Sequence, residues 1–153
     1  MTVPECEAYE EARKCAHRII KAREKTSHDL LKRLQEKGHS RSVSEKVVER
    51  FNEVGLVDDE RFTELYIRSA QYSGKGWRRI TRELQQKGID VQYLEPPLDE
   101  EELERASQVI ARFTVETYKD RERLLRKLVT KGYSYGIAKQ VVAAKTNDSP
   151  LSP

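Results

Sequence analysis

The stretch ITRELQQKG at residues 80–88 has two counterparts in the chain, LLKRLQEKG at residues 30–38 and LLRKLVTKG at residues 124–132. Each copy places two apolar residues four positions apart, which puts them on one face of a helix. Each copy then ends in lysine and glycine, because a cation favours the negative end of the helix dipole and glycine closes a helix. The final glycines lie 50 and 44 residues apart, a period typical of stacked helical repeats.

The composition fits such a repeat array. The chain has 153 residues, of which 36% are charged and 37% belong to the apolar class. An array accommodates these proportions because each unit buries one face against its neighbours and leaves the rest in water. Strand signals are nearly absent. We therefore predict an all-α protein made of three tandem three-helix repeats in an elongated, curved array.

Capping signals divide the first repeat into three helices. A capping box at residues 2–5 (TVPE) opens a long amphipathic helix that runs to about Lys25. The pattern at residues 26–29 (TSHD) opens the second helix, and the pattern at residues 42–45 (SVSE) opens the third. Gly55 ends the third helix, so one repeat contains three helices.

The second repeat begins with a helix that acidic residues are suited to cap. Asp58 and Asp59 precede this helix, and an aspartate at that position accepts hydrogen bonds from free amide groups. Within the helix, the spacing predicts that Phe62, Leu65 and Tyr66 face the core.

Glycine and proline residues set the boundaries of the predicted elements after residue 72. The connection at residues 73–76 (SGKG) is predicted to act as a hinge before the helix that Trp77 begins. Asp90 caps a helix that should be short, because residues 96–97 are both proline. Further helices are predicted from Asp99, over residues 121–131 and around residues 137–142. The domain boundaries that follow are 1–57, 58–98 and 99–146 for the three repeats and 147–153 for a disordered tail.

Residues that carry enzymatic or metal chemistry do not converge in this sequence. The three histidines, His17, His28 and His39, follow no metal-ligand spacing and are predicted to be solvated surface residues. The acidic run at residues 99–104 is explained by the dipole at the start of a helix, without calcium. We therefore predict a protein that is not an enzyme and has no catalytic residue, cofactor or metal site.

The cysteines and the hydropathy indicate a cytoplasmic protein. Cys6 and Cys15 lie nine positions apart on one predicted helix, which suits neither a local disulfide nor a zinc pair. We expect both to be reduced and half-buried. No apolar run approaches membrane-spanning length, and the N-terminus lacks the pattern of a signal peptide.

The distribution of charge is more informative than its total. The formal net charge is only +3, but basic bands at residues 61–87 and 119–131 flank an acidic band at residues 95–104. The basic helix that follows Trp77 is a candidate contact surface for phosphates or an acidic protein, and a merely solvated face is the alternative. Trp77 itself is interpreted as a packing anchor rather than a base-stacking residue. The candidates for partner or DNA binding are Arg68, Lys75, Arg78, Arg79, Arg82, Lys87, Arg123, Arg126, Lys127 and Lys131.

The central part of the chain closely resembles the signature of the bacterial RecX family. The resemblance rests on GLVDDERF at residues 55–62, on Gly74-x-Gly76 and on the glycine-terminated helix at residues 79–89. It extends outward to about residues 10–145 and implies three tandem three-helix repeats. The chain departs from the family where Trp77 replaces the usual proline, and where Pro96-Pro97 interrupts a segment that is usually helical.

The resemblance implies a non-enzymatic regulator, mainly an inhibitor, of RecA, the ATP-dependent recombinase that polymerises on single-stranded DNA. The implied mode of action is to lie in the groove of the RecA filament and to suppress ATP hydrolysis, strand exchange and filament growth. Such a role belongs to homologous recombination, DNA repair and the SOS response. The implied partners are the RecA filament and single- or double-stranded DNA, with no membrane, and the chain is expected to be a monomer.

Two other functions remain open from the sequence. An autonomous nucleic-acid-binding helical module would bind DNA with little sequence preference, and its affinity would fall steeply with salt. A plain helical scaffold for another protein would show neither this behaviour nor an effect on RecA. Titration against naked single-stranded DNA and against preformed RecA filaments separates the three functions.

Overall fold

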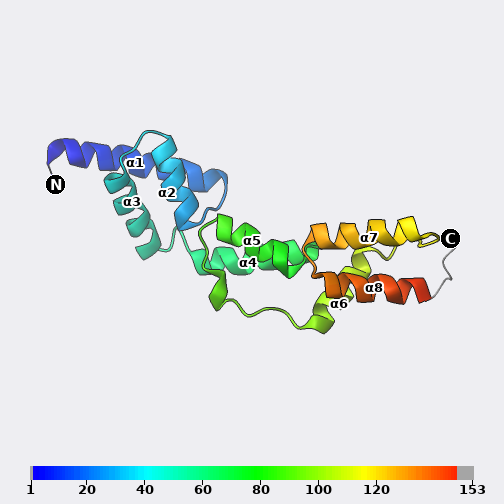
Figure 1. Cartoon of the computed structure of the whole chain (residues 1–153). Helices are drawn as coiled ribbons and strands as arrows, with labels where there is room; N and C mark the ends of the chain where they lie inside the picture. Colours follow the sequence, from blue (N-terminus) through cyan, green and yellow to red (C-terminus); the bar gives the residue numbers. More distant parts are fainter. Residues whose placement is uncertain (1, 148–153) are drawn as a thin grey trace. The chain divides into compact units, whose positions relative to one another are not determined.

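The computed structural model describes residues 2–147 (Figure 1). They form eight α-helices and one short 3-10 helix, and no strand occurs within this range, which confirms the predicted all-α class. The helices are α1 (Val3–Ala22), α2 (Ser27–Glu36), α3 (Arg41–Glu53), α4 (Asp59–Tyr72), α5 (Trp77–Gln86), α6 (Asp99–Val109), α7 (Tyr118–Lys131) and α8 (Tyr135–Asn147), with the 3-10 helix η1 (Val91–Tyr93) between α5 and α6.

The chain divides into two compact units. The first unit contains the described chain up to Leu65 together with Gln85–Ile89, and the second contains Tyr66–Leu84 and the chain from Asp90 onward. The three tandem repeats, their curvature and the boundaries 1–57, 58–98 and 99–146 stay predictions. Helix α8 reaches Asn147, one residue into the predicted tail, and residues 148–153 lie outside the described residues.

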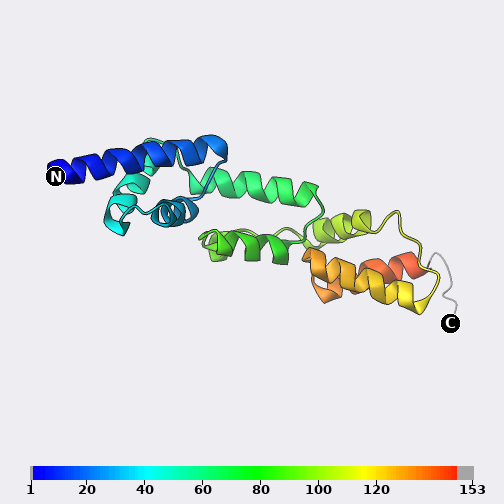
Figure 2. The ribbon, with the colours of Figure 1, turned by 90° about the horizontal axis from the view of Figure 1, so that it is seen from above.

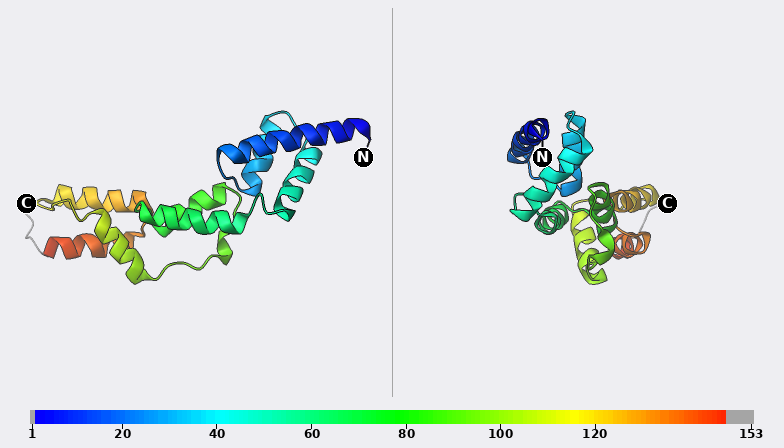
Figure 3. Two further views of the ribbon diagram at one scale, coloured as in Figure 1. Left: turned by 180° about the vertical axis from the view of Figure 1, so that it is seen from behind. Right: turned by 90° about the vertical axis from the view of Figure 1, so that its left-hand side faces the viewer.

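Each unit has its own apolar core. In the first unit, α1, α2 and α3 pack on one another (Figure 2). Phe51 belongs to the buried cluster of this unit. In the second unit, α6 and α7 both pack on α8 (Figure 3). Tyr133 and Val142 belong to the buried cluster of this unit. The apolar pairs of the three repeated phrases are all buried, as their four-residue spacing predicted. These pairs are Leu30 with Leu34, Ile80 with Leu84, and Leu124 with Leu128.

Side-chain caps open the helices of the first unit. The predicted capping box of α1 is present, and the hydroxyl of Thr26 accepts the amide of Asp29 at 3.2 Å at the start of α2. The prediction that Ser42 opens α3 was wrong. The hydroxyl of Ser40 accepts the amide of Val43 at 3.2 Å, so the helix begins two residues earlier and Ser42 lies within it.

Among the later helices, two caps agree with the prediction and one helix begins earlier than predicted. Asp58 caps α4 and Asp90 caps the short η1, both as predicted. Helix α7 begins at Tyr118, three residues before the expected start, because Thr117 and Asp120 form a capping box there.

The cysteines and two of the histidines differ from their predicted environments. Cys15 is buried on α1 and Cys6 is exposed, so neither is half-buried. His17 is half-buried, with its ring centroid 4.7 Å from that of Phe51, because it lies on the edge of the apolar face of α1. His39 is half-buried as well, whereas His28 is exposed, as predicted.

Inside the first unit, the glycine that ends α5 meets the start of α2. The hydroxyl of Thr26 donates to the carbonyl of Lys87 at 2.7 Å. Gly88 has φ +81°, and a Cβ built on it would lie 2.3 Å from the Cβ of His28. Only glycine fits here, because the backbone is left-handed and the neighbouring side chain leaves no room.

Inside the second unit, the glycine that ends α7 meets the start of α5 in the same way. The amide of Gly76 donates to the carbonyl of Lys131 at 2.8 Å, and the amide of Arg78 donates to the carbonyl of Gly132 at 3.0 Å. A Cβ built on Gly76 would lie 2.4 Å from the carbonyl carbon of Gly132. We use the name glycine joint for this close approach of Gly76 to Gly132 together with the two hydrogen bonds, from Gly76 to Lys131 and from Arg78 to Gly132.

The connection at residues 73–76 is therefore not the predicted hinge. Besides the bonds of the glycine joint, the amide of Lys75 donates to the carbonyl of Ala70 at 3.0 Å, and the phenol of Tyr133 donates to the carbonyl of Gly74 at 2.9 Å. Glycine serves close backbone approach here rather than flexibility, and the joint fixes where α5 begins.

Candidate partner-binding surface

The start of α5 is held by groups from other helices. Gly76 occupies the N-cap position and has no side chain with which to accept a hydrogen bond from the first turn. The amides of Gly76 and Arg78 instead donate to the two carbonyls at the end of α7. The amide of Trp77, between them, donates to the carboxylate of Glu102 at 2.8 Å. Three backbone donors that a helix start normally leaves free are thus satisfied, and the direction of α5 is fixed.

Glu102 was missed by the sequence analysis, which assigned it to the acidic first turn of its own helix. The residue is only 5% exposed, and its carboxylate contacts the guanidinium of Arg105 at 3.2 Å as well as the amide of Trp77. The available signal was its spacing: Glu102 stands four residues before the buried Ala106 and so shares the inward face of α6.

Three side chains converge on the carboxylate of Glu83, which lies on α5. The phenol of Tyr66 donates to it, the ammonium of Lys75 contacts it at 2.9 Å, and the Nε of Arg79 donates to it at 2.9 Å. The side chain of Glu83 is 20% exposed. Lys75 and Arg79, both proposed as contact residues, are therefore already paired within the protein.

The pKa of Glu83 reflects this network. Burial alone would raise it, but hydrogen bonds from Tyr66, Lys75 and Arg79 together lower the pKa to about 2. Glu83 is therefore ionised at any pH at which the protein works, and it neutralises part of the basic band.

We predict that Glu83 makes unfolding dependent on pH between about 4.5 and 2. Its folded pKa lies below the ordinary value of 4.5, so its contribution to stability is complete above pH 4.5 and is lost as the pH falls towards 2. Glu83→Gln should lower the free energy of unfolding by roughly 2 to 3 kcal/mol at pH 7. Urea denaturation of both proteins at a series of pH values should show this difference shrinking in acid.

The matched control is Glu122→Gln, since Glu122 is exposed on α7 and is not one of the carboxylates that these contacts join. It should denature like the wild type throughout. A gap between Glu83→Gln and the wild type that stays constant with pH would contradict an ionic role for Glu83.

Two arginines of α5 remain exposed. Arg78 and Arg82 lie four residues apart, which puts them on one face of the helix. Neither joins an ion pair found among the described residues. Arg78 also stands in the first turn, where the helix dipole disfavours a cation, so local stability does not account for it. Arg68 is exposed on α4.

The candidates on α7 differ in their surroundings. Arg123 contacts Asp120 at 3.4 Å, and the ammonium of Lys127 lies 5.1 Å from the centre of the Phe113 ring. Arg126 is exposed. Arg123 also keeps 72% of its side chain exposed, so Arg123 and Arg126 are both accessible to a partner.

Two lysines of the repeated phrases, Lys87 and Lys131, are binding candidates, and both lie at helix ends. Lys131 is half-buried, and its carbonyl belongs to the glycine joint. The ammonium of Lys87 lies 3.7 Å from Asp29 and 5.8 Å from the centre of the Phe62 ring. Both residues therefore already make contacts within the protein, and a partner would have to compete with these contacts.

Trp77 and the pair Pro96-Pro97, at which the sequence departs from the RecX signature it resembles, line the same groove. Trp77 is half-buried, and together with Pro96, Pro97 and Leu98 it lines a groove of about 460 Å³ in the second unit. The packing role predicted for the indole stays a prediction. The prolines reach the groove because the chain between η1 and α6 is extended rather than helical.

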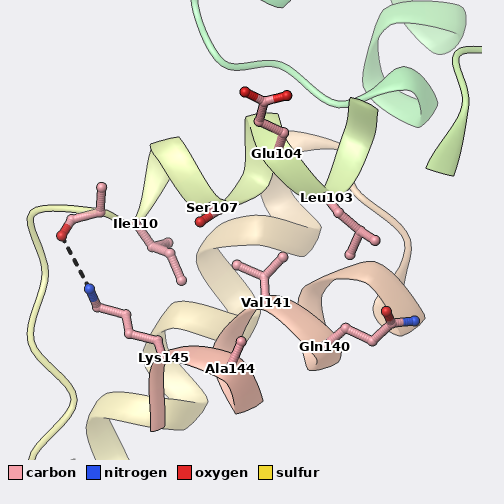
Figure 4. Close-up of a pocket in the computed structure, with 9 residues that line it drawn as sticks. Leu103, Glu104, Ser107, Ile110, Gln140, Val141, Ala144 and Lys145 are labelled. Carbon is pink, nitrogen blue, oxygen red and sulfur yellow. Dashed lines mark hydrogen bonds between the residues drawn. The ribbon is translucent and has the colours of Figure 1, made fainter. Parts of the chain in front are cut away.

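A second groove lies between α6 and α8 and has a volume of about 630 Å³. Figure 4 shows Leu103 and Ile110 from the α6 side facing Val141 from α8, with Lys145 at one end. The ammonium of Lys145 donates to the carbonyl of Ala111 at 3.1 Å. None of the ten candidate bases lines this groove, so it is separate from the candidate surface.

Within residues 2–147, no group of three or more histidine, cysteine or acidic side chains is arranged to hold a metal ion. Over the same range, no helix combines the length and the hydropathy that crossing a bilayer requires.

Comparison with known proteins gives consistent matches. Residues 58–94 match the family model described as RecX, second three-helix domain. The chain is 33% identical over 150 residues to Regulatory protein RecX of Mycobacterium sp. (strain KMS), a match that covers 89% of this chain and 82% of that protein. It is 31% identical over 153 residues to Regulatory protein RecX of Halorhodospira halophila (strain DSM 244 / SL1), and 95% of each chain is covered. The crystal structure of RecX from Lactobacillus salivarius has the same fold, with a TM-score of 0.74 at 18% identity over 93% of this chain and 99% of that one.

Proposed function

Because the chain belongs to the RecX family of regulatory proteins, we propose that it inhibits RecA by binding in the groove of the RecA filament on single-stranded DNA. Bound there, it suppresses ATP hydrolysis, strand exchange and filament growth. It acts in the cytoplasm as a monomer and performs no chemical reaction of its own.

The observation that carries the proposal is the exposed face of α5. Arg78 and Arg82 are presented on a helix whose first amides donate three hydrogen bonds to acceptors of α6 and of the end of α7. Charged groups on a pre-organised surface give an interface its specificity, since little ordering is needed on binding. Carboxylates of the filament, or phosphates of its DNA, are the groups that such arginines bind best.

The ion pairs of Glu83 remove two residues from the list of contact candidates. Glu83 pairs Lys75 and Arg79, so we place the contact on Arg78 and Arg82, with Arg68 and Arg126 as further exposed candidates. Breaking the Glu83 pairs on binding would leave a partly buried carboxylate without its partners, which costs free energy.

We predict that the wild-type chain slows the single-stranded-DNA-dependent ATPase of RecA in a saturable manner. The rate should fall well below half at a ratio of one chain to a few RecA subunits. The same chain should bind naked single-stranded DNA more weakly than preformed RecA filaments at equal salt, as measured by fluorescence anisotropy of a labelled chain.

The alternative is an autonomous nucleic-acid-binding module, which the two exposed arginines also permit. It predicts equal affinity for naked and RecA-coated DNA, with a steep fall as salt rises. A RecA ATPase that stays at its full rate while the chain binds naked DNA would overturn the first proposal in favour of this one.

A further inference from the structure

A pocket between α1 and α2 gathers positive charge in the first unit. It has a volume of about 340 Å³, and Cys15 and Ile19 form part of its apolar lining. Every charged residue that lines it is a base. These residues are Arg18, Arg23, Lys25, Arg33 and Lys37.

None of these residues was among the ten binding candidates of the sequence analysis. They come from the last turns of α1, from the connection to α2 and from the last turn of α2 with its C-cap. They belong to two successive helices and their connection, and the packing of α1 against α2 brings them together.

Nearby carboxylates offset little of this charge. Glu24 lies beside the pocket in sequence, but it pairs with Arg61 at 3.0 Å. Glu36 contacts Arg33 at 3.3 Å, yet both side chains of this pair are about half exposed, so water screens the interaction. Like charges around a concave surface concentrate the field inside it and attract anions.

We propose that this pocket binds phosphate groups. Arginine offers paired N–H donors that match two phosphate oxygens, and lysine adds a mobile point charge. The volume is at the lower end for ligand sites, which suits one or two phosphates with an attached sugar rather than a large organic molecule. The apolar lining supplies a surface for the carbon atoms of the sugar.

Two sources of phosphate fit this chemistry, the backbone of a single strand and a free polyphosphate such as a nucleotide carries. Two probes distinguish them: a labelled oligothymidylate and inorganic tripolyphosphate. Both are to be titrated into the full chain without RecA, so the result does not depend on the proposed inhibition.

The test variant is Arg18→Gln, Arg33→Gln and Lys37→Gln combined. All three side chains are exposed at the rim, so the fold should remain, and circular dichroism melting checks this. If the single strand is the ligand, its affinity should fall roughly ten-fold, and the slope of log affinity against log salt should fall by about two units. If a free polyphosphate is the ligand, only tripolyphosphate binding should fall.

The matched control is Lys14→Gln, Lys32→Gln and Lys46→Gln combined, which removes the same charge from exposed positions outside the pocket. It should retain binding of whichever probe the pocket takes. The proposal is overturned if the wild type binds neither probe, or if the two triple variants bind both probes equally well.

Discussion

Gly132→Ala is expected to destabilise the protein by roughly 3 to 4 kcal/mol. Gly132 has φ +108°, and a Cβ on it would lie 2.4 Å from the Cβ of Arg79 and 2.8 Å from the carbonyl oxygen of Gly76. The strain of a left-handed alanine is thus added to a clash with a main chain that is itself hydrogen-bonded. Urea denaturation followed by circular dichroism measures the loss. Inhibition of RecA should weaken as well, because the start of α5 moves.

The control for this prediction is Gly38→Ala. Gly38 has a similar φ of +98°, but a Cβ on it would meet nothing within 4 Å. Its replacement therefore measures the backbone strain alone, roughly 1 to 2 kcal/mol. If Gly132→Ala and Gly38→Ala destabilise the protein equally, the close contact at the glycine joint contributes nothing.

Reversing the charge of Arg78 and Arg82 to glutamate should abolish inhibition of RecA while leaving the fold intact. Glutamate in the first turn of α5 suits the helix dipole better than arginine does, so melting should stay near that of the wild type. Like charges at an interface cost several kcal/mol, which corresponds to more than a hundred-fold loss of affinity. Half-inhibition of the RecA ATPase should therefore move beyond the attainable concentration range.

Arg79 is left unchanged in this variant, because its loss would break the pair with Glu83 and confuse stability with binding. The control is Lys119→Glu with Lys139→Glu, which makes the same change of charge at two other exposed positions of the second unit. It should inhibit nearly as well as the wild type. Full inhibition by the Arg78 and Arg82 variant would show that this face of α5 is solvated, and would direct attention to Arg126.

The parts of the fold that the sequence predicted are those set by local rules. The apolar pairs of the repeated phrase are buried because four-residue spacing defines a helical face by itself. For α4, which carries no copy of the phrase, the sequence predicted the wrong inward-facing residue. Leu65 was expected to face the core but is 47% exposed. Thr63 and Ala70 are buried in its place. Several phases of a helix with scattered apolar residues are compatible with one sequence, and only packing selects among them.

The parts that could not be predicted depend on contacts between distant segments. Glycine at residue 76 suggested flexibility, whereas its partner is Gly132, brought next to it by the fold. The arginines of α5 formed one candidate group in the sequence. The structure separates Arg79, which Glu83 pairs, from Arg78 and Arg82, which remain exposed. The basic pocket likewise could not be predicted, because its lining residues come from both α1 and α2 and gather only when these helices pack.

The glycine joint bears on how such a protein can change over time. Its hydrogen bonds connect main-chain atoms, so the side chains at residues 78 and 131 do not determine whether it forms. Arg78 can be exchanged for another residue without a compensating substitution on α7. If the exposed face of α5 is the contact surface we propose, a lineage can change its partner by substitutions on α5 while the two glycines keep the position of the helix.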